Sequence, residues 1–106
     1  MSRDVMKEID EEVNAHPVVL YMKGTRVFPR CGFSAEAAGM LEELGVEFHD
    51  VDILADPDKR EAVKVYSDWQ TLPQLYVSGE FVGGRDIMVA MHTKGELAPI
   101  VRAAAA

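Results

Sequence analysis

Cys31 is the residue best suited to chemistry, because it is the only cysteine in a chain of 106 residues. It follows the apolar run 18–22, typical of a buried strand, and precedes residues 35–44, typical of a helix. A thiol at such a junction lies near the unpaired N–H groups of the helix start and near the cations Lys23 and Arg30, which stabilise negative charge on sulfur. The pattern therefore predicts a reactive thiol.

A lone cysteine is also a common small core residue, so its neighbours decide between the two interpretations. Pro29, Arg30, Gly32 and Ser34 make a poor apolar pocket but a good exposed turn, which favours the reactive thiol. Ser34 stands where Cys-x-x-Cys redox proteins carry their second thiol. This chain therefore cannot close an internal disulfide.

Composition limits the classes of function. About a hundred residues, 48% of them apolar, predict a single domain over residues 1–106 with one modest core. A formal charge of −7, from 18 acidic and 11 basic residues, argues against nucleic acid or an anionic membrane as the main partner. No apolar run could span a bilayer, and the N-terminal residues do not resemble a signal sequence. One cysteine suits a reducing compartment, so we expect a cytoplasmic protein, although a trimmed organellar precursor would look the same.

The sequence pattern of the first half of the chain predicts a helix, a strand, a second helix and a second strand. Ser2 is the expected cap of a first helix that ends before Pro17, and residues 18–22 form the first strand. A second helix up to Gly45 and a strand over residues 46–53 follow. The expected buried side of the second helix comprises Phe33, Ala37, Met40, Leu41 and Leu44.

The pattern of the second half predicts a helix, two strands and two further helices. Asp56 and Pro57 are a helix cap and first helical residue, and that helix runs towards Ser67. Strands 75–77 and 81–82 flank a turn, a fourth helix with apolar positions such as Ile87 opens at residues 83–86, and a last helix starts at Glu96. The order α-β-α-β-α-β-β-α-α, with a right-handed parallel crossover and one hairpin, predicts an α/β four-stranded mixed sheet with helices on both faces.

Four blocks of this sequence resemble the signatures of the monothiol, CGFS-type glutaredoxins, in the family's order and at similar separations. Similarity runs from about Met6 to about Ile100. The resemblance implies a thioredoxin fold, which agrees with the order of elements, and a cis bond between Leu72 and Pro73. The blocks are Lys23-Gly24-Thr25, Cys31-Gly32-Phe33-Ser34, the stretch from Trp69 to Tyr76, and the stretch from Gly79 to Ile87.

The resemblance implies a glutathione site at Lys23, Arg60, Leu72, Arg85 and Asp86. Lys23 and Arg60 would meet one carboxylate, and the Leu72 backbone would hold the middle of the tripeptide. The N–H groups of Arg85 and Asp86 would hold the other carboxylate, and the Asp86 side chain would accept from the amine. Each residue also has a plainer interpretation: Arg60 as a solvated helix residue and Asp86 as a helix cap, for example.

Three functions follow from this resemblance. In the first, two chains each supply Cys31 and two glutathione thiols complete the ligation of a [2Fe-2S] cluster, which the homodimer passes to apoproteins or shares with a BolA-type protein. In the second, Cys31 removes glutathione from protein mixed disulfides as an enzyme needing one thiol, an activity that such a loop implies is weak. The third is an interaction module that docks a partner through residues 69–76.

The sequence departs from the family pattern at two positions near the thiol. Arg26 replaces the usual proline after Lys-Gly-Thr, so we expect a less rigid and more basic loop. Arg85 replaces a small residue or cysteine, and the sequence leaves open whether it contacts a ligand carboxylate or crowds a cluster. Together with Lys23 and Arg30, these arginines predict a positive patch around Cys31.

Overall fold

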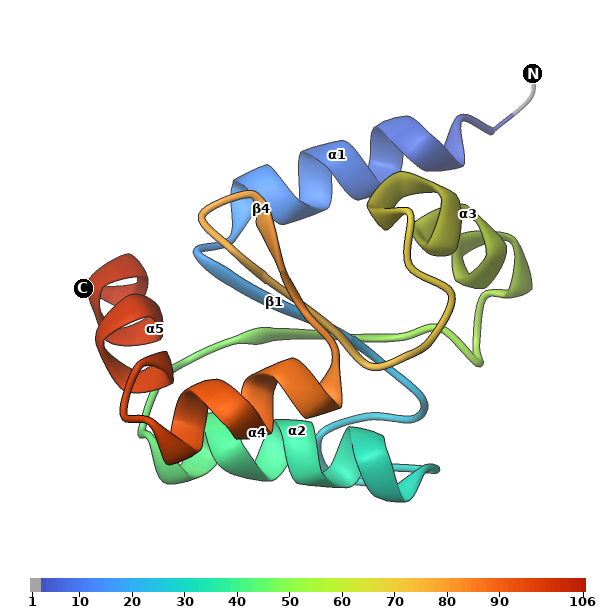
Figure 1. The fold of residues 1–106 in the computed structure, drawn as a ribbon. Helices are drawn as coiled ribbons and strands as arrows, with labels where there is room; N and C mark the ends of the chain where they lie inside the picture. The colour runs from blue at the N-terminus through green and yellow to red at the C-terminus, as the bar shows by residue number, and fades with distance from the viewer. Residues whose placement is uncertain (1–2) are drawn as a thin grey trace.

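The computed structural model describes residues 3–106, and in this part of the chain the nine elements follow the predicted order (Figure 1). Their bounds are α1 Val5–Ala15, β1 Val18–Met22, α2 Gly32–Glu43, β2 His49–Asp52, α3 Pro57–Ser67, β3 Gln74–Val77, β4 Glu80–Gly83, α4 Arg85–Thr93 and α5 Leu97–Ala105. None of the helices in residues 3–106 is long and apolar enough to cross a membrane.

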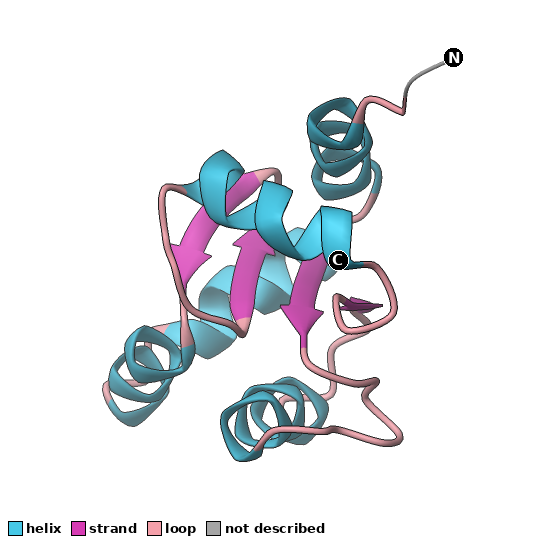
Figure 2. Ribbon diagram, turned by 90° about the vertical axis from the view of Figure 1, so that its right-hand side faces the viewer, coloured by secondary structure: helices cyan, strands magenta, loops and turns pink. Residues whose placement is uncertain are grey.

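The four strands form one sheet in the order β2-β1-β3-β4. Strand β1 pairs in parallel with β2 and antiparallel with β3, which in turn pairs antiparallel with β4. Helices α1 and α3 pack together on one face, while α2, α4 and α5 cover the other (Figure 2). The predicted α/β class, with its four-stranded mixed sheet in a thioredoxin fold, is confirmed.

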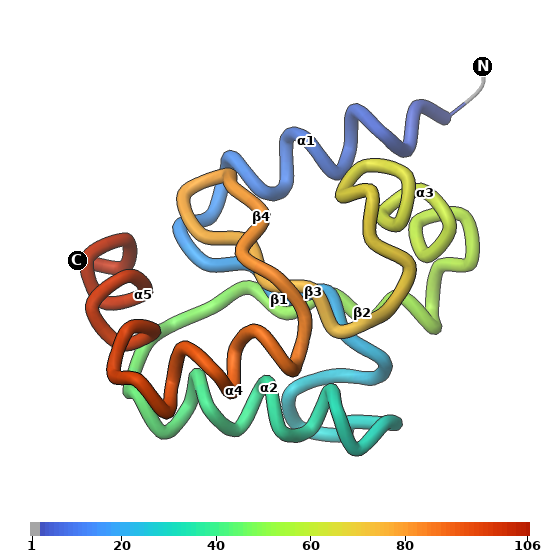
Figure 3. Tube along the Cα trace, in the orientation of Figure 1, coloured from blue at the N-terminus to red at the C-terminus, as the bar shows by residue number. Residues whose placement is uncertain are grey.

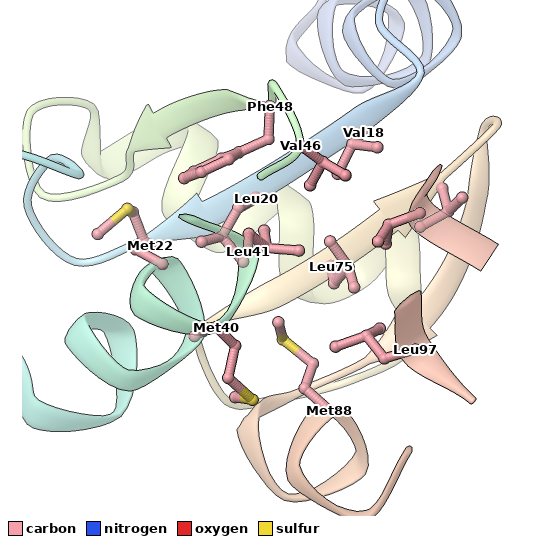
Figure 4. Packing of buried hydrophobic residues seen from close by; sticks show 14 residues of the cluster. Val18, Leu20, Met22, Met40, Leu41, Val46, Phe48, Leu75, Met88 and Leu97 are labelled. Atoms are coloured by element: carbon pink, nitrogen blue, oxygen red, sulfur yellow. The ribbon is translucent and has the colours of Figure 1, made fainter. Parts of the chain in front are cut away.

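Strand β1 lies at the centre of both cores. Val18, Leu20 and Met22 point to the face covered by α2, α4 and α5 (Figure 4), whereas Val19 and Tyr21 point to the face covered by α1 and α3. All five side chains are buried, as expected for a continuous apolar strand with helices on both sides. Burial of one such side chain contributes roughly 1.5–3 kcal/mol, so the strand that ends just before Lys23 is firmly held.

Several boundaries differ from the predicted ones for local reasons. The predicted cap Ser2 lies outside the described residues, and Asp4 caps α1 by accepting from the Lys7 N–H at 3.0 Å. Helix α2 begins at Gly32 rather than residue 35, because Cys31 itself is the N-cap. Strand β2 begins at His49, since the preceding apolar residues are buried without pairing in the sheet. Asp56 and Pro57 open α3 as predicted.

Candidate functional site

A tightly folded loop joins β1 to the N-cap Cys31 (Figure 3). The Arg30 N–H donates to the Lys23 carbonyl at 2.9 Å, and the Thr25 N–H donates to the Phe28 carbonyl at 3.2 Å. Gly24 makes this reversal with φ +89°, where an added Cβ would lie 2.5 Å from the Phe28 carbonyl oxygen. The loop therefore returns to its starting point and places Cys31 near Lys23.

Strand β2 holds this loop through two aspartates. Asp52 accepts from the Gly24 N–H and Asp50 accepts from the Arg26 N–H, both at 2.9 Å. The Arg26 guanidinium lies 3.9 Å above the Phe48 ring and pairs with Glu42. A proline at position 26 could not donate to Asp50, so the arginine allows a contact that the family's usual residue does not. Of the predicted positive patch, Lys23 and Arg85 line the cavity described below, whereas Arg26 and Arg30 do not.

The Cys31 thiol is half-buried, and its surroundings favour the thiolate. The Ser34 N–H is the main cause that lowers the pKa of Cys31, with further contributions from the Phe33 N–H, the Lys23 ammonium and the Ser34 hydroxyl. Burial opposes them without reversing the direction. The structure thus provides both predicted causes, a helix start and a nearby cation, and that cation is Lys23.

Ser34 has a position that the sequence did not predict. We expected it in an exposed turn, but it is fully buried and its hydroxyl oxygen accepts from the Lys23 N–H at 3.0 Å. One side chain thus joins the end of β1 to the first turn of α2. This contact fixes Lys23 relative to the thiol, and it depends on a partner 11 residues away in the chain.

A cavity of about 590 Å³ opens beside Cys31. It lies between the start of α2, one side of α3, the loop before β3 and the start of α4. All six residues that the sequence singled out line it: Lys23, Cys31, Arg60, Leu72, Arg85 and Asp86. Its other lining residues are Phe33, Lys64, Trp69, Gln70, Thr71, Pro73, Gly84 and Ile87.

Two cations on the α3 side of this cavity, Lys23 just after β1 and Arg60 on α3, lack counter-ions within residues 3–106. Neither Lys23 nor Arg60 forms an ion pair there, and the Arg60 Nε is buried without a hydrogen-bond partner. Lys64, one helical turn further on, pairs with Glu61 at 3.1 Å. A buried guanidinium donor without an acceptor is costly, so this wall of the cavity suits an anionic group supplied by a ligand.

The loop before β3 forms the floor of the cavity. The Leu72–Pro73 peptide bond is cis, as the family resemblance implied. Gln74 is fully buried, and its amide donates to the carbonyls of Trp69 and Thr71 at 3.0 and 3.2 Å. Neither the N–H nor the carbonyl of Leu72 has a hydrogen-bond partner in the described part of the chain. The Leu72 backbone can therefore pair with an extended ligand.

Sequence analysis gave Gln74 no role beyond its place in the family block 69–76 and started the strand one residue later, at Leu75. Gly84 completes the same region, because a Cβ there would lie 3.2 Å from the Trp69 indole nitrogen and 3.3 Å from the Pro73 carbonyl oxygen. This glycine lets α4 begin close to the loop.

The α4 wall of the cavity carries paired charges. Arg85 donates from Nε to Glu36 on α2 and from Nη1 to Asp86 at 2.8 Å, and its guanidinium lies 5.2 Å from the centre of the Phe33 ring. Asp86 does not cap the helix, since the N-cap is Gly84, and its side chain is 89% exposed. Its carboxylate is therefore accessible to a ligand.

Three apolar side chains on the cavity wall remain exposed. Phe33 is 55%, Ile87 42% and Trp69 41% exposed. The sequence assigned Phe33 and Ile87 to buried helix faces, which is wrong because each lies in the first turn of its helix. Trp69 both lines the cavity and packs against the Phe81 ring, with 6.0 Å between ring centres.

Metal-binding capacity is limited to what Cys31 itself can offer. Within residues 3–106, no group of three or more histidine, cysteine, aspartate or glutamate side chains could hold a metal ion. His16 and His49 stack at 4.0 Å between ring centres, His49 lies 3.5 Å from Glu12, and neither histidine lines the cavity. Any metal bound at Cys31 would need ligands from outside this chain.

Comparisons with known proteins agree on one family. The family model described as Glutaredoxin matches residues 18–82. The uncharacterized monothiol glutaredoxin ycf64-like of Synechocystis is 44% identical over 106 residues, which cover all of this chain and 99% of that protein. Rice monothiol glutaredoxin-S11 is 51% identical over 91% of this chain, but the match spans only 20% of the rice protein. The solution structure of reduced poplar apo GrxS14 superposes with a TM-score of 0.81 at 46% identity, covering 92% of this chain and 90% of the poplar chain.

Proposed function

This chain belongs to the monothiol glutaredoxins, and from that premise we propose that it binds glutathione beside Cys31 and carries a [2Fe-2S] cluster between proteins. The single observation that carries the proposal is the chemistry of the cavity: a thiol with a lowered pKa lies beside cations that have no counter-ion within residues 3–106. A small thiol compound with carboxylate groups would supply the negative charge that these cations lack.

Glutathione matches the cavity group by group. One carboxylate would take the donors of Lys23 and Arg60, which accounts for the buried Arg60 Nε. The Leu72 backbone would pair with the middle of the peptide. The first N–H groups of α4 and the Asp86 carboxylate would hold the carboxylate and amine of the other end. The thiol of glutathione would then lie near Cys31.

The count of thiols determines how a cluster could be held. A [2Fe-2S] cluster takes four ligands, and this chain offers one cysteine. Cys31 of two chains and the thiols of two bound glutathione molecules make four. The cluster is therefore a cargo shared by a homodimer, and the exposed Phe33 and Ile87 beside the cavity would be covered by the second chain or by an acceptor.

Anaerobic reconstitution tests the carrier proposal. Protein incubated with iron, sulfide and glutathione and then desalted is expected to be brown and to elute as a dimer, and protein desalted from the same mixture without glutathione is expected to be colourless. Cys31→Ser should stay colourless in both. A colourless wild type, or a coloured Cys31→Ser protein, would refute the carrier role.

A second function rests on the same lowered thiol pKa. The Cys31 thiolate would attack the glutathione sulfur of a protein mixed disulfide and release the protein thiolate. A second glutathione thiolate would then attack the Cys31 mixed disulfide, giving oxidised glutathione and regenerating the Cys31 thiolate. Rapid reduction of a glutathione mixed disulfide by purified protein would favour this role, and turnover lost in Cys31→Ser would assign it to the thiol.

Partners and location are part of the carrier proposal. A cytoplasmic carrier would deliver the cluster to iron-sulfur apoproteins and would share it with a BolA-type protein where one is present. Mixing the cluster-loaded dimer with such a protein should change the visible absorption and circular dichroism spectra. Unchanged spectra would exclude a BolA-type partner.

A further inference from the structure

The Arg85 side chain has contacts that neither the family pattern nor its role as a backbone donor explains. Its guanidinium pairs with Glu36 and Asp86 and lies over the Phe33 ring. The contact with Glu36 joins the first turn of α4 to the second turn of α2, beside the cavity. Both carboxylates raise the pKa of Arg85, so the charge on this side chain is permanent.

The donor count leaves Arg85 with capacity for a ligand. A guanidinium has five N–H donors, and the contacts with Glu36 and Asp86 use two of them. The others have no partner within residues 3–106, and the residue lines the cavity. The free N–H groups lie on Nη1 and Nη2, and such donors beside a helix start are suited to a carboxylate.

Asp86 places the opposite charge directly beside this fork. One of its oxygens accepts from Arg85 at 2.8 Å, and the carboxylate is 89% exposed. An α-amino acid group carries an ammonium and a carboxylate on one carbon, so it has the same two charges at the same short separation. Laid against Arg85 and Asp86, it would meet each charge with its opposite.

We propose that Arg85 is a specificity-determining residue: together with Asp86 it selects ligands whose amine and carboxylate share one carbon, and Glu36 is the positioning residue that holds it. This inference rests on the proposed glutathione site, whose γ-glutamyl end carries such a group. The sequence left open whether Arg85 contacts a ligand carboxylate or crowds a cluster, and under this inference it contacts the carboxylate.

Calorimetry with three S-methylated tripeptides tests the inference without thiol exchange. The first is S-methylglutathione. The second lacks the α-carboxylate, with γ-aminobutyrate in place of the γ-glutamyl residue, and the third lacks the amine, with a glutaryl group in that place. Wild type should bind the first compound at least roughly tenfold more tightly than the second, the scale of one charge-assisted contact.

Arg85→Ala should reduce this carboxylate preference by roughly tenfold and leave the affinity for the second compound nearly unchanged. Arg85→Lys should recover part of the preference, and Glu36→Gln should lower it by a smaller factor. Asp86→Asn should instead reduce the preference for the first compound over the third. Lys94→Ala, which removes an exposed cation after the last turn of the same helix, should change neither ratio.

The ratios of the three affinities separate a role in selectivity from a structural role, because a loosened fold would weaken the binding of all three compounds together. If Arg85→Ala and Arg85→Lys both keep the wild-type carboxylate preference, the inference is wrong while the glutathione site stands. Tighter binding of all three compounds by Arg85→Ala would also overturn it, since Arg85 would then only compete for Asp86. If wild type binds none of the three, the glutathione site itself fails, and the inference falls with it.

Discussion

On the α3 side of the cavity, Lys23 and Arg60 have no counter-ion within residues 3–106, whereas on the α4 side Arg85 is paired with both Glu36 and Asp86. The two walls therefore differ in what a ligand must contribute. The α3 wall offers two cations without a counter-ion, so we expect it to accept anions of many shapes. The α4 wall sets one cation between two carboxylates, so we expect it to favour a group that presents both signs.

The difference also separates binding from stability. An unpaired cation near a cavity wall loses hydration without gaining an ion pair, so apart from the effect of Lys23 on the Cys31 thiolate it adds little to folding until a ligand arrives. The exposed Arg85 pair links two helices but contributes little to the stability of the fold, because exposed ion pairs are weak. Affinity should therefore depend mainly on the α3 wall, and selectivity on the α4 wall.

Substitution of Lys23 should have the largest effect on glutathione affinity, because Lys23 belongs to the α3 wall. Lys23→Ala should weaken glutathione binding by about 1–3 kcal/mol, because a charge-assisted hydrogen bond to the ligand carboxylate is lost. Arg60→Met should have an effect of similar size, and the double variant a larger one. Calorimetry with glutathione measures all three.

The same variants should leave the free energy of unfolding unchanged or slightly higher in urea titrations, since they remove a cation without a partner. Lys94→Ala is the matched control, because it removes an exposed cation far from the cavity. Unaltered glutathione affinity in Lys23→Ala would mean that the α3 wall does not bind the carboxylate.

Removal of the Ser34 hydroxyl should loosen the hold of α2 on Lys23. Ser34→Ala leaves the Lys23 N–H without its acceptor, which should cost about 1–3 kcal/mol in the free energy of unfolding. The pKa of Cys31 should rise as well, because the Ser34 hydroxyl is one of its stabilising contacts. Urea unfolding measures the first effect and the pH dependence of Cys31 alkylation the second.

Ser78→Ala removes an exposed serine hydroxyl elsewhere and serves as the control for both measurements. A wild-type alkylation profile in Ser34→Ala would show that the Ser34 hydroxyl does not stabilise the thiolate and that this residue acts on the thiol through its backbone N–H.

The order of elements and the fold could be predicted because their signals are local. The apolar run of β1, the Asp56-Pro57 helix start and the turn at Gly79 each lie within a few residues of the structure they specify. The positions of the cavity residues came from the family resemblance, since neither spacing nor composition brings Arg60 to Cys31. The described structure places them around one cavity.

The contacts that sequence analysis did not predict are made with partners distant in the chain. The Arg26 N–H bonds to Asp50, 24 residues away, and the hydroxyl of Ser34 reaches back to Lys23. Helical periodicity assigned Phe33 and Ile87 to the core because it marks the side of a helix. It does not reveal that the first turns of α2 and α4 extend beyond the sheet and line the cavity.

The smallest expected effect is the pH dependence that Cys31 imposes on stability. Its folded-state pKa is lowered, so at pH values between the folded pKa and the unfolded value near 8.5 the unfolded chain binds more protons than the native one. Stability contributed by the thiolate should therefore rise with pH across that interval and be lost as pH falls through the folded pKa. Cys31→Ser cannot titrate there, so the difference in unfolding free energy between wild type and this variant should increase with pH in anaerobic urea titrations. A difference that stays flat or decreases would mean that neither the N–H groups at the start of α2 nor Lys23 favours the thiolate, and Lys23 would then act on the ligand alone.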